Sequence, residues 1–213
     1  MKKLTIIGGS GFLGKSFIDY AETYGFSKWG IKKIILKSRK KIKIKNQKKV
    51  EIKHMSADIS LMKKLPSTDY IIYAVNSENS KLNHSAIRNF TNLIKKISRK
   101  TKIVFTSSGA VYGKLKNKQN YTKDKIIIEK IFQNYGANGF KVSIARLFTF
   151  FGKRILEDKR YAISEFINSG LNKKKIYVKS NKIVYRSYMH SNDLVIWLMK
   201  ILFNSNQKCP IYD

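Results

Sequence analysis

The chain has 213 residues, of which 43% are hydrophobic, so it can bury a sizeable core, and this composition argues against wholesale disorder. Its formal net charge at pH 7 is +31, from 44 basic residues against 13 acidic ones. Because 37 of the 44 basic residues are lysine, which lacks the bidentate fork that arginine offers to bases and phosphates, the charge favours a compositional bias and predicts no specific nucleic-acid partner.

Cys209 is the only cysteine, which excludes an internal disulfide and a thiolate metal site and predicts a reducing, cytoplasmic location. We predict no metal site. No apolar run approaches the roughly 20 residues that span a bilayer, so no membrane partner is expected. The start MKKLTIIGGSGFLG (1–14) resembles a signal peptide, but its glycines and the missing small-residue cleavage site predict a strand and a turn.

Over the first 150 residues, apolar runs rich in isoleucine and valine alternate with helical patterns. Strands are predicted at 4–7, 33–36, 50–55, 69–75, 102–107 and 141–148, and helices at 12–24, 83–98 and 122–135. Several strands are almost continuously apolar, as strands buried on both faces are. The alternation predicts an α/β fold with a doubly wound parallel sheet, the Rossmann fold.

The pattern loosens beyond residue 150. A helix is predicted near 161–171, a short strand near 175–179 and a further helix over 192–203. We therefore expect residues 1–150 to form the main domain and residues 151–213 a smaller lobe. The densest basic segment, 36–49, is predicted to be a solvated loop.

Four glycines fall within seven residues of the segment IIGGSGFLGKSF (6–17), between the first predicted strand and the first helix. Glycines permit a tight turn and a close approach of backbone N–H groups to a pyrophosphate, while the helix N-terminus adds a partial positive charge. In this strand–turn–helix context the loop predicts a dinucleotide site. Its predicted contacts are Gly8, Gly11, Phe12, Leu13 and Gly14.

The end of the second predicted strand indicates which dinucleotide binds. NAD-binding proteins usually place an acidic residue there for the ribose 2′-hydroxyl, but this chain has LKSRKK (36–41), which contains no acid. Ser38, Arg39 and Lys40 suit a 2′-phosphate instead. NADP is therefore the predicted cofactor, with NAD as the alternative.

A second group of residues carries acid/base chemistry. Ser108 ends the fifth predicted strand, and Tyr121 and Lys125 are four apart, so they share one face of a helix. A lysine ammonium beside a phenol stabilises the phenolate, and a serine hydroxyl beside both can hold a substrate oxygen. This set predicts proton transfer on a carbinol or ketone while hydride moves to or from a nicotinamide.

With these motifs the chain resembles the extended short-chain dehydrogenases/reductases, in particular the nucleotide-sugar epimerases, dehydratases and reductases. The resemblance covers essentially the whole chain. It rests on GGSGFLG (8–14), DYIIYAVN (69–76), TSSGAVYG (106–113), RLFTFFG (146–152) and YRSYMHSNDL (185–194).

The resemblance implies roles for further residues. The cofactor contacts that it implies, besides the glycine loop, are Asp58, Ile59, Val75, Tyr121 and Lys125. Ser108, Thr149 and Arg186 would contact the substrate, with Arg186 on the phosphates of a sugar nucleotide. His190 and Asp193 are expected to be structural. A homodimer is among the oligomeric states that the sequence leaves open.

The chain departs from the family at several points. Only 13 positions separate Ser108 from Tyr121, which predicts a trimmed substrate-covering loop. No acid lies between these two residues, where 4,6-dehydratases carry one, and no cysteine follows the serine, as a 3,5-epimerising base would require. Relatives continue beyond the point where CPIYD (209–213) stands, so we expect 151–213 to be a partial, truncated substrate-binding lobe.

Three functions follow, in order of preference. The first is reduction of a 4-keto-6-deoxy sugar nucleotide by NADPH, and the second is a 4-epimerase that resembles UDP-glucose 4-epimerase and holds NAD. The third is a non-catalytic dinucleotide-binding or nucleic-acid-binding protein on the same scaffold.

Overall fold

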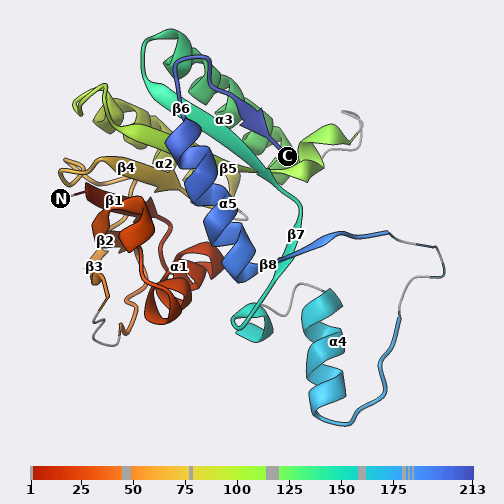
Figure 1. Ribbon diagram of the computed structural model, residues 1–213. Coiled ribbons are helices and arrows are strands. Elements are labelled where there is room, and N and C mark those ends of the chain that lie inside the picture. The colour runs from red at the N-terminus through yellow and green to blue at the C-terminus, as the bar shows by residue number, and fades with distance from the viewer. Residues whose placement is uncertain are drawn as a thin grey trace.

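The computed structural model describes residues 2–44, 49–76, 79–113, 120–157, 162–178, 181, 183 and 185–213. Its centre is a seven-stranded, fully parallel sheet in the order β3-β2-β1-β4-β5-β6-β9 (Figure 1). The strands are β1 (Lys2–Ile7), β2 (Ile31–Ser38), β3 (Glu51–Ser56), β4 (Tyr70–Tyr73), β5 (Lys102–Ser108), β6 (Lys141–Leu147) and β9 (Ile211–Tyr212). This order is that of a Rossmann fold, with its topological switch point between β1 and β4.

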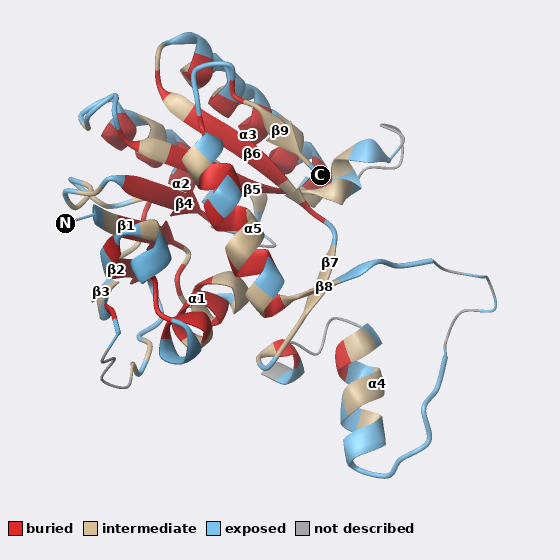
Figure 2. Ribbon diagram, in the orientation of Figure 1, coloured by how far each residue is buried: buried red, intermediate tan, exposed pale blue. Residues whose placement is uncertain are grey.

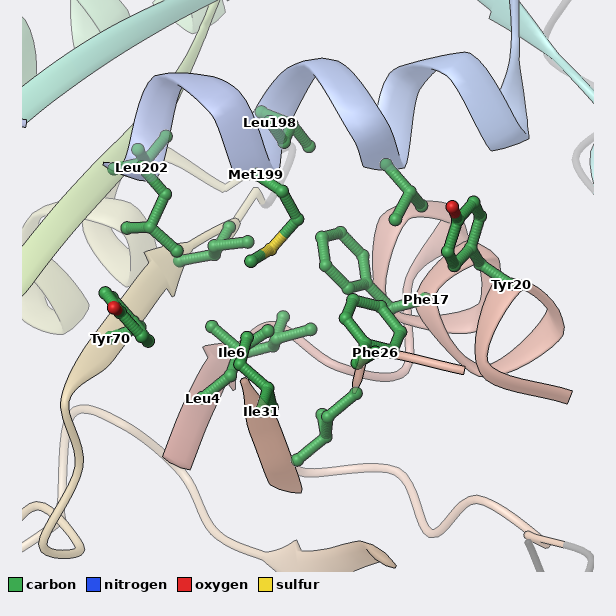
Figure 3. Close-up of a cluster of buried hydrophobic side chains, with 14 of the residues drawn as sticks. Leu4, Ile6, Phe17, Tyr20, Phe26, Ile31, Tyr70, Leu198, Met199 and Leu202 are labelled. Atoms are coloured by element: carbon green, nitrogen blue, oxygen red, sulfur yellow. The ribbon is translucent and has the colours of Figure 1, made fainter. Parts of the chain in front are cut away.

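Helices cover both faces of the sheet, and alternate residues of each strand supply the two cores. On one face, α1 (Phe12–Thr23) and α5 (Ser191–Asn204) pack on Leu4, Ile6 and Tyr70 (Figure 3). On the other face, α2 (Ser80–Ile94) and α3 (Asn120–Ala137) pack on Ile7, Ile71 and Tyr73. Because both faces are buried, the strands need apolar residues at nearly every position, which explains the continuous isoleucine and valine runs.

Smaller elements complete the chain. Short 3-10 helices lie at Ser27–Trp29, Gly109–Tyr112 and Ile155–Glu157. A separate two-stranded parallel sheet joins β7 (Thr149–Phe151) to β8 (Tyr188–His190), and α4 (Ala162–Leu171) lies away from the main sheet (Figure 1). Residues 172–178, which follow α4, are exposed (Figure 2). No helix of the described ranges is long and apolar enough to cross a membrane.

The predicted doubly wound parallel sheet is confirmed, and each predicted helix has a counterpart in α1 to α5. The strand predicted near 175–179 is wrong, because the described residues 175–178 are exposed and form no strand, while residue 179 lies outside the described residues. The strands β7, β8 and β9, which have only two or three residues each, are too short for their periodicity to be predicted.

The segment 151–213 does not stay apart from the main domain. From Ser191 onward, α5 packs into the core beside α1, and β9 extends the sheet next to β6. The division of the chain at residue 150 remains a prediction. Of the basic run 36–49, the first three residues belong to β2 and residues 45–48 lie outside the described residues.

One prediction concerns α3, which carries Tyr121 and Lys125. Phe132 is 1% exposed and stacks on Phe105 of β5 with ring centroids 5.0 Å apart. Phe132→Ala should lower the free energy of unfolding by about 3–5 kcal/mol, as the loss of a buried aromatic ring usually does. Urea unfolding measures this change. Ile127→Ala on the same helix is the control, because Ile127 is 45% exposed and should cost little; equal losses in the two variants would contradict this packing.

Candidate active site

A cleft of about 880 Å³ opens at the carboxyl ends of the parallel strands. Its walls come from the ends of β1, β2, β5 and β6, from the residues after β3 and β4, and from the first turns of α1, α2 and α3. Ligands of open α/β sheets bind at this edge, at the topological switch point. The fold therefore places a candidate binding site where a dinucleotide would be expected.

The glycine loop forms the floor of the cleft between β1 and α1. Gly8 has a φ of +93°, a conformation that other residues rarely adopt, and a Cβ on it would lie 2.4 Å from the backbone oxygen of Ala74. The N–H groups of Gly8 and Gly9 both donate to the backbone oxygen of Lys37, at 2.9 and 3.0 Å. The loop is thus held against the ends of β2 and β4, and Gly8 is required by the close backbone approach.

Gly11 and Gly14 serve different purposes. A Cβ on Gly14 would lie 2.0 Å from the backbone oxygen of Gly9, so α1 packs directly on the loop. Gly11 lines the cleft, and a Cβ there would meet nothing closer than 3.4 Å. Phe12 and Leu13 also line the cleft, and the first N–H groups of a helix have no acceptor within it. This cradle fits a diphosphate.

Basic side chains surround the end of β2. Lys37, Ser38, Arg39 and Lys40 all line the cleft. The Ser38 hydroxyl donates to the backbone oxygen of Lys40 and lies 2.9 Å from Nε2 of His54. Burial and the nearby Lys53 lower the pKa of Lys37. A bound anion at this end of the cleft would stabilise the charged form of this lysine.

Asp58 lies at the same end, after β3. Its Oδ1 accepts from the hydroxyl and the N–H of Ser60, at 2.6 and 2.9 Å. These hydrogen bonds, with a smaller contribution from Arg39, hold the pKa of Asp58 below its usual value. Asp58, Ile59 and Val75, which the resemblance predicted as cofactor contacts, all line the cleft.

The predicted acid/base residues line the other end of the cleft. Ser108 ends β5, and Tyr121 and Lys125 lie one turn apart at the start of α3. The Lys125 ammonium donates to the backbone oxygen of Thr106 at 3.0 Å and lies 5.6 Å from the ring centroid of Tyr121. Burial lowers the pKa of Lys125 to about 8. The structure therefore brings these three residues into the cleft that the glycine loop begins.

The predicted substrate contacts are placed differently. Thr149, at the start of β7, and Arg186, in an exposed segment, are not among the residues that line the cleft. The phosphate contact assigned to Arg186 remains a prediction. Residues 114–119, most of the connection predicted to be trimmed, lie outside the described residues.

Two aromatic side chains that were not predicted as site residues also line the cleft. Phe148 and Phe150 follow β6 at alternate positions, and the ring of Phe150 lies 4.8 Å from that of Phe12. Alternate residues of an extended segment point the same way, so the spacing in RLFTFFG (146–152) was the signal that could have found them.

Comparison with known proteins agrees with this site. The model of the NAD-dependent epimerase/dehydratase family matches residues 4–212, and the chain belongs to this family. This match confirms the family resemblance and the use of a nicotinamide dinucleotide as the family's cofactor. No sequence match was found among the curated proteins.

Solved structures similar to this chain are enzymes of nucleotide sugars. A dTDP-glucose 4,6-dehydratase from Bacillus anthracis in complex with NAD has a TM-score of 0.80 and 17% identity, over 100% of this chain and 74% of that one. A UDP-N-acetylglucosamine 4-epimerase from Bacillus cereus has a TM-score of 0.68 and 16% identity, over 97% and 74%. A UDP-glucuronic acid 4-epimerase from Bacillus cereus, in complex with UDP-glucuronic acid and NAD, has a TM-score of 0.69 and 15% identity, over 98% and 76%. At these identities the likeness shows the fold.

The cradle around Gly11 generates a prediction. Gly11→Val places a branched side chain in the open space that a diphosphate would fill, so affinity for NADPH and NADH should collapse while the fold is kept. Calorimetric titration measures the affinity, and thermal unfolding checks the fold.

Two other glycines serve as controls for this variant. Gly170 lies outside the cleft and a Cβ on it would meet nothing within 4 Å, so Gly170→Val should leave cofactor affinity unchanged. Gly14→Val should lower the free energy of unfolding, because α1 must move off the loop. Unchanged cofactor affinity in a folded Gly11→Val variant would refute the assignment of the glycine loop to the cofactor diphosphate.

Proposed function

We propose that the protein reduces a 4-keto-6-deoxy sugar nucleotide with NADPH, using Ser108, Tyr121 and Lys125. The observation that carries the proposal is that these three side chains line the same cleft as the glycine loop. If the diphosphate of a cofactor lay on Gly8 and Gly11, its nicotinamide would extend along the same cleft toward these three side chains. The proposed substrate is a nucleotide sugar because the chain belongs to a family of that chemistry.

The proposed cofactor contacts divide by their place in the cleft. Gly8, Gly11, Phe12, Leu13 and Gly14 would form the diphosphate cradle; Ser38, Arg39, Lys40, Asp58 and Ile59 the adenosine end; and Val75, Tyr121 and Lys125 the nicotinamide end. A nicotinamide bound there supplies a hydride for the carbonyl carbon.

The reduction also needs a proton on the carbonyl oxygen. The Tyr121 hydroxyl is the proposed proton donor, and the Ser108 hydroxyl would hold the same oxygen by a hydrogen bond. Lys125, charged and fixed to the end of β5, would stabilise the phenolate that Tyr121 becomes after giving up its proton. Thr149 and Arg186 are retained as proposed substrate contacts, although neither lines the cleft.

The acidic residues near the cleft favour reduction over dehydration. Asp58 is the only carboxylate among the described residues that line the cleft, and it follows β3, which three other strands separate from β5 in the sheet. A 4,6-dehydratase needs an acid beside the sugar for the elimination of water. The Ser108 end offers none among the lining residues, so elimination is not the proposed chemistry.

A 4-epimerase that retains NAD is the second candidate. Two of the similar solved structures are 4-epimerases, and one of them contains NAD. Both candidates use the same Ser108, Tyr121 and Lys125, but only the reductase consumes the reduced cofactor. Incubation with NADPH and a nucleotide-4-keto-6-deoxysugar therefore separates them, because loss of absorbance at the reduced nicotinamide band accompanies reduction and not epimerisation.

Tyr121→Phe tests the proton donor. The variant keeps the ring and removes the only transferable proton of that side chain, so turnover should fall by about 10²- to 10⁴-fold. Cofactor affinity should barely change. Tyr135→Phe on the same helix is the matched control, because the Tyr135 hydroxyl donates to the backbone of Thr91 and does not line the cleft. Full activity in Tyr121→Phe, measured by initial rates, would refute the assignment.

Arg39→Ala tests the choice of cofactor. If Arg39 contacts a 2′-phosphate, its loss should weaken NADPH by about one to two decades, since a charge-assisted hydrogen bond contributes about 1.5–3 kcal/mol. NADH affinity should change little. Arg88→Ala on the exposed side of α2 is the matched control. Calorimetric titration of the unmodified chain measures both affinities. If NADH binds as tightly as NADPH, the NADP assignment is wrong.

A further inference from the structure

Asp124, which directly precedes Lys125 in α3, is a buried carboxylate that the proposed reaction does not use. It is 4% exposed. Its oxygens accept from the hydroxyl of Ser80 at 2.7 Å and from the side-chain amide of Asn83 at 3.1 Å. Nε2 of His84 lies 2.9 Å from Oδ1, within ion-pair distance, although its alignment is not that of a hydrogen bond. A carboxylate is buried at this depth only when such partners compensate it.

All three partners come from the first turns of α2. This helix begins at Ser80, soon after β4, and its residues Leu82 and Ala86 line the cleft. Asp124 therefore ties the part of α2 that borders the cleft to the part of α3 that carries Tyr121 and Lys125.

The same carboxylate acts on Lys125. The Lys125 ammonium donates to the backbone oxygen of Thr106 and lies 5.0 Å from the Phe105 ring centroid and 5.6 Å from that of Tyr121. Asp124 and Glu129 of the same helix are the carboxylates whose charges act on it. Burial lowers the pKa of Lys125, and the negative charges of Asp124 and then Glu129 oppose that shift.

Glu129 has a cation of its own. Its two oxygens accept from Nε and NH2 of Arg146 on β6, at 3.1 and 2.8 Å, and Oε1 also accepts from the Ser107 hydroxyl. The guanidinium balances the charge of Glu129, whereas the partners of Asp124 on α2 include no arginine or lysine. Among these partners only the His84 imidazole can carry a positive charge, and only when it is protonated, so Asp124 has no counterpart to the arginine that pairs with Glu129.

We infer that Asp124 is a positioning residue: its buried carboxylate sets a negative charge beside Lys125 in α3 and fastens the first turns of α2 beside the cleft. The consequence for catalysis rests on the role proposed above for Lys125. Without the charge of Asp124, Lys125 should lose its proton at a lower pH, because burial would then be opposed by Glu129 alone.

A double-mutant cycle tests the link to Lys125 without any cofactor. The free energy of unfolding is measured in urea from pH 6 to pH 10 for the unmodified chain, Asp124→Asn, Lys125→Met and the double variant. At pH 6 to 7 Lys125 is charged in the folded protein, so the two substitutions should couple by about tenfold or more in the unfolding equilibrium constant. The coupling should fade as the pH rises through about 8, where the ammonium loses its proton.

Asp193→Asn combined with Lys125→Met is the matched control. Asp193 is an exposed aspartate in the first turn of α5 and does not line the cleft, so it should show no coupling at any pH. Absence of coupling between Asp124 and Lys125 at pH 6 to 7, or coupling of the same size at pH 10, would overturn the inference.

Hydrogen exchange tests the attachment of α2 and covers the case in which Asp124→Asn does not fold. Ser80→Ala leaves the carboxylate in place but removes one of its hydrogen-bonded partners on α2, so amides in the first turns of α2, including that of Asn83, should exchange several-fold faster. Amides of α5 should not change. Unchanged exchange in α2 would show that Asp124 does not anchor this helix.

Cofactor titration separates this inference from the proposed function. If both hold, the pH above which NADPH affinity declines should be lower in Asp124→Asn than in the unmodified chain and unchanged in Asp193→Asn. If the unmodified chain binds no NADPH, the proposed function fails, while the coupling and exchange measurements still decide the role of Asp124. If NADPH binds and its pH dependence is the same in Asp124→Asn, the inference fails alone.

Discussion

The buried ammonium of Lys125 constrains the middle of the molecule, because a charge removed from water is costly unless neighbouring groups compensate it. The compensation comes from several elements at once: the backbone oxygen of Thr106 on β5, and the carboxylates of Asp124 and Glu129 on α3. Those carboxylates in turn need partners, which α2 supplies to Asp124 and Arg146 of β6 supplies to Glu129. The polar groups around this one charge therefore come from α2, α3, β5 and β6.

The opposite end of the cleft is governed by close backbone packing. Gly8 and Gly14 allow β1, α1 and the end of β4 to approach more closely than any side chain would permit, and Gly11 keeps the surface open. The positive side chains of Lys37, Arg39 and Lys40, at and after the end of β2, line the cleft beside this loop. The two ends differ in chemistry, because one is built from backbone and cations and the other from a hydroxyl, a phenol and an ammonium.

How far the sequence predicts this arrangement depends on the range over which each signal acts. Six strands of the main sheet and the glycine loop were predictable because periodicity and the strand–turn–helix context are local. Burial on both faces explains why the strand at 102–107 was recognised, whereas the apolar run near 175–179 has no sheet partner among the described residues and forms no strand. The contacts of Asp124 were not predictable, because its hydrogen-bond partners precede it by 41 and 44 residues. Arg186 was assigned from a family motif alone, and its segment is exposed.

In the proposed reaction, a hydride passes from the cofactor in this cleft to a carbonyl carbon while residues of the chain protonate the oxygen. The most direct test is to incubate the chain with NADPH deuterated at the transferable position and a nucleotide-4-keto-6-deoxysugar, and to analyse the sugar by mass spectrometry and NMR. The account predicts a product heavier by one deuterium, bound to carbon 4, formed together with oxidised cofactor. Recovery of the keto sugar and the deuterated cofactor unchanged, although calorimetry shows that both bind, would contradict it.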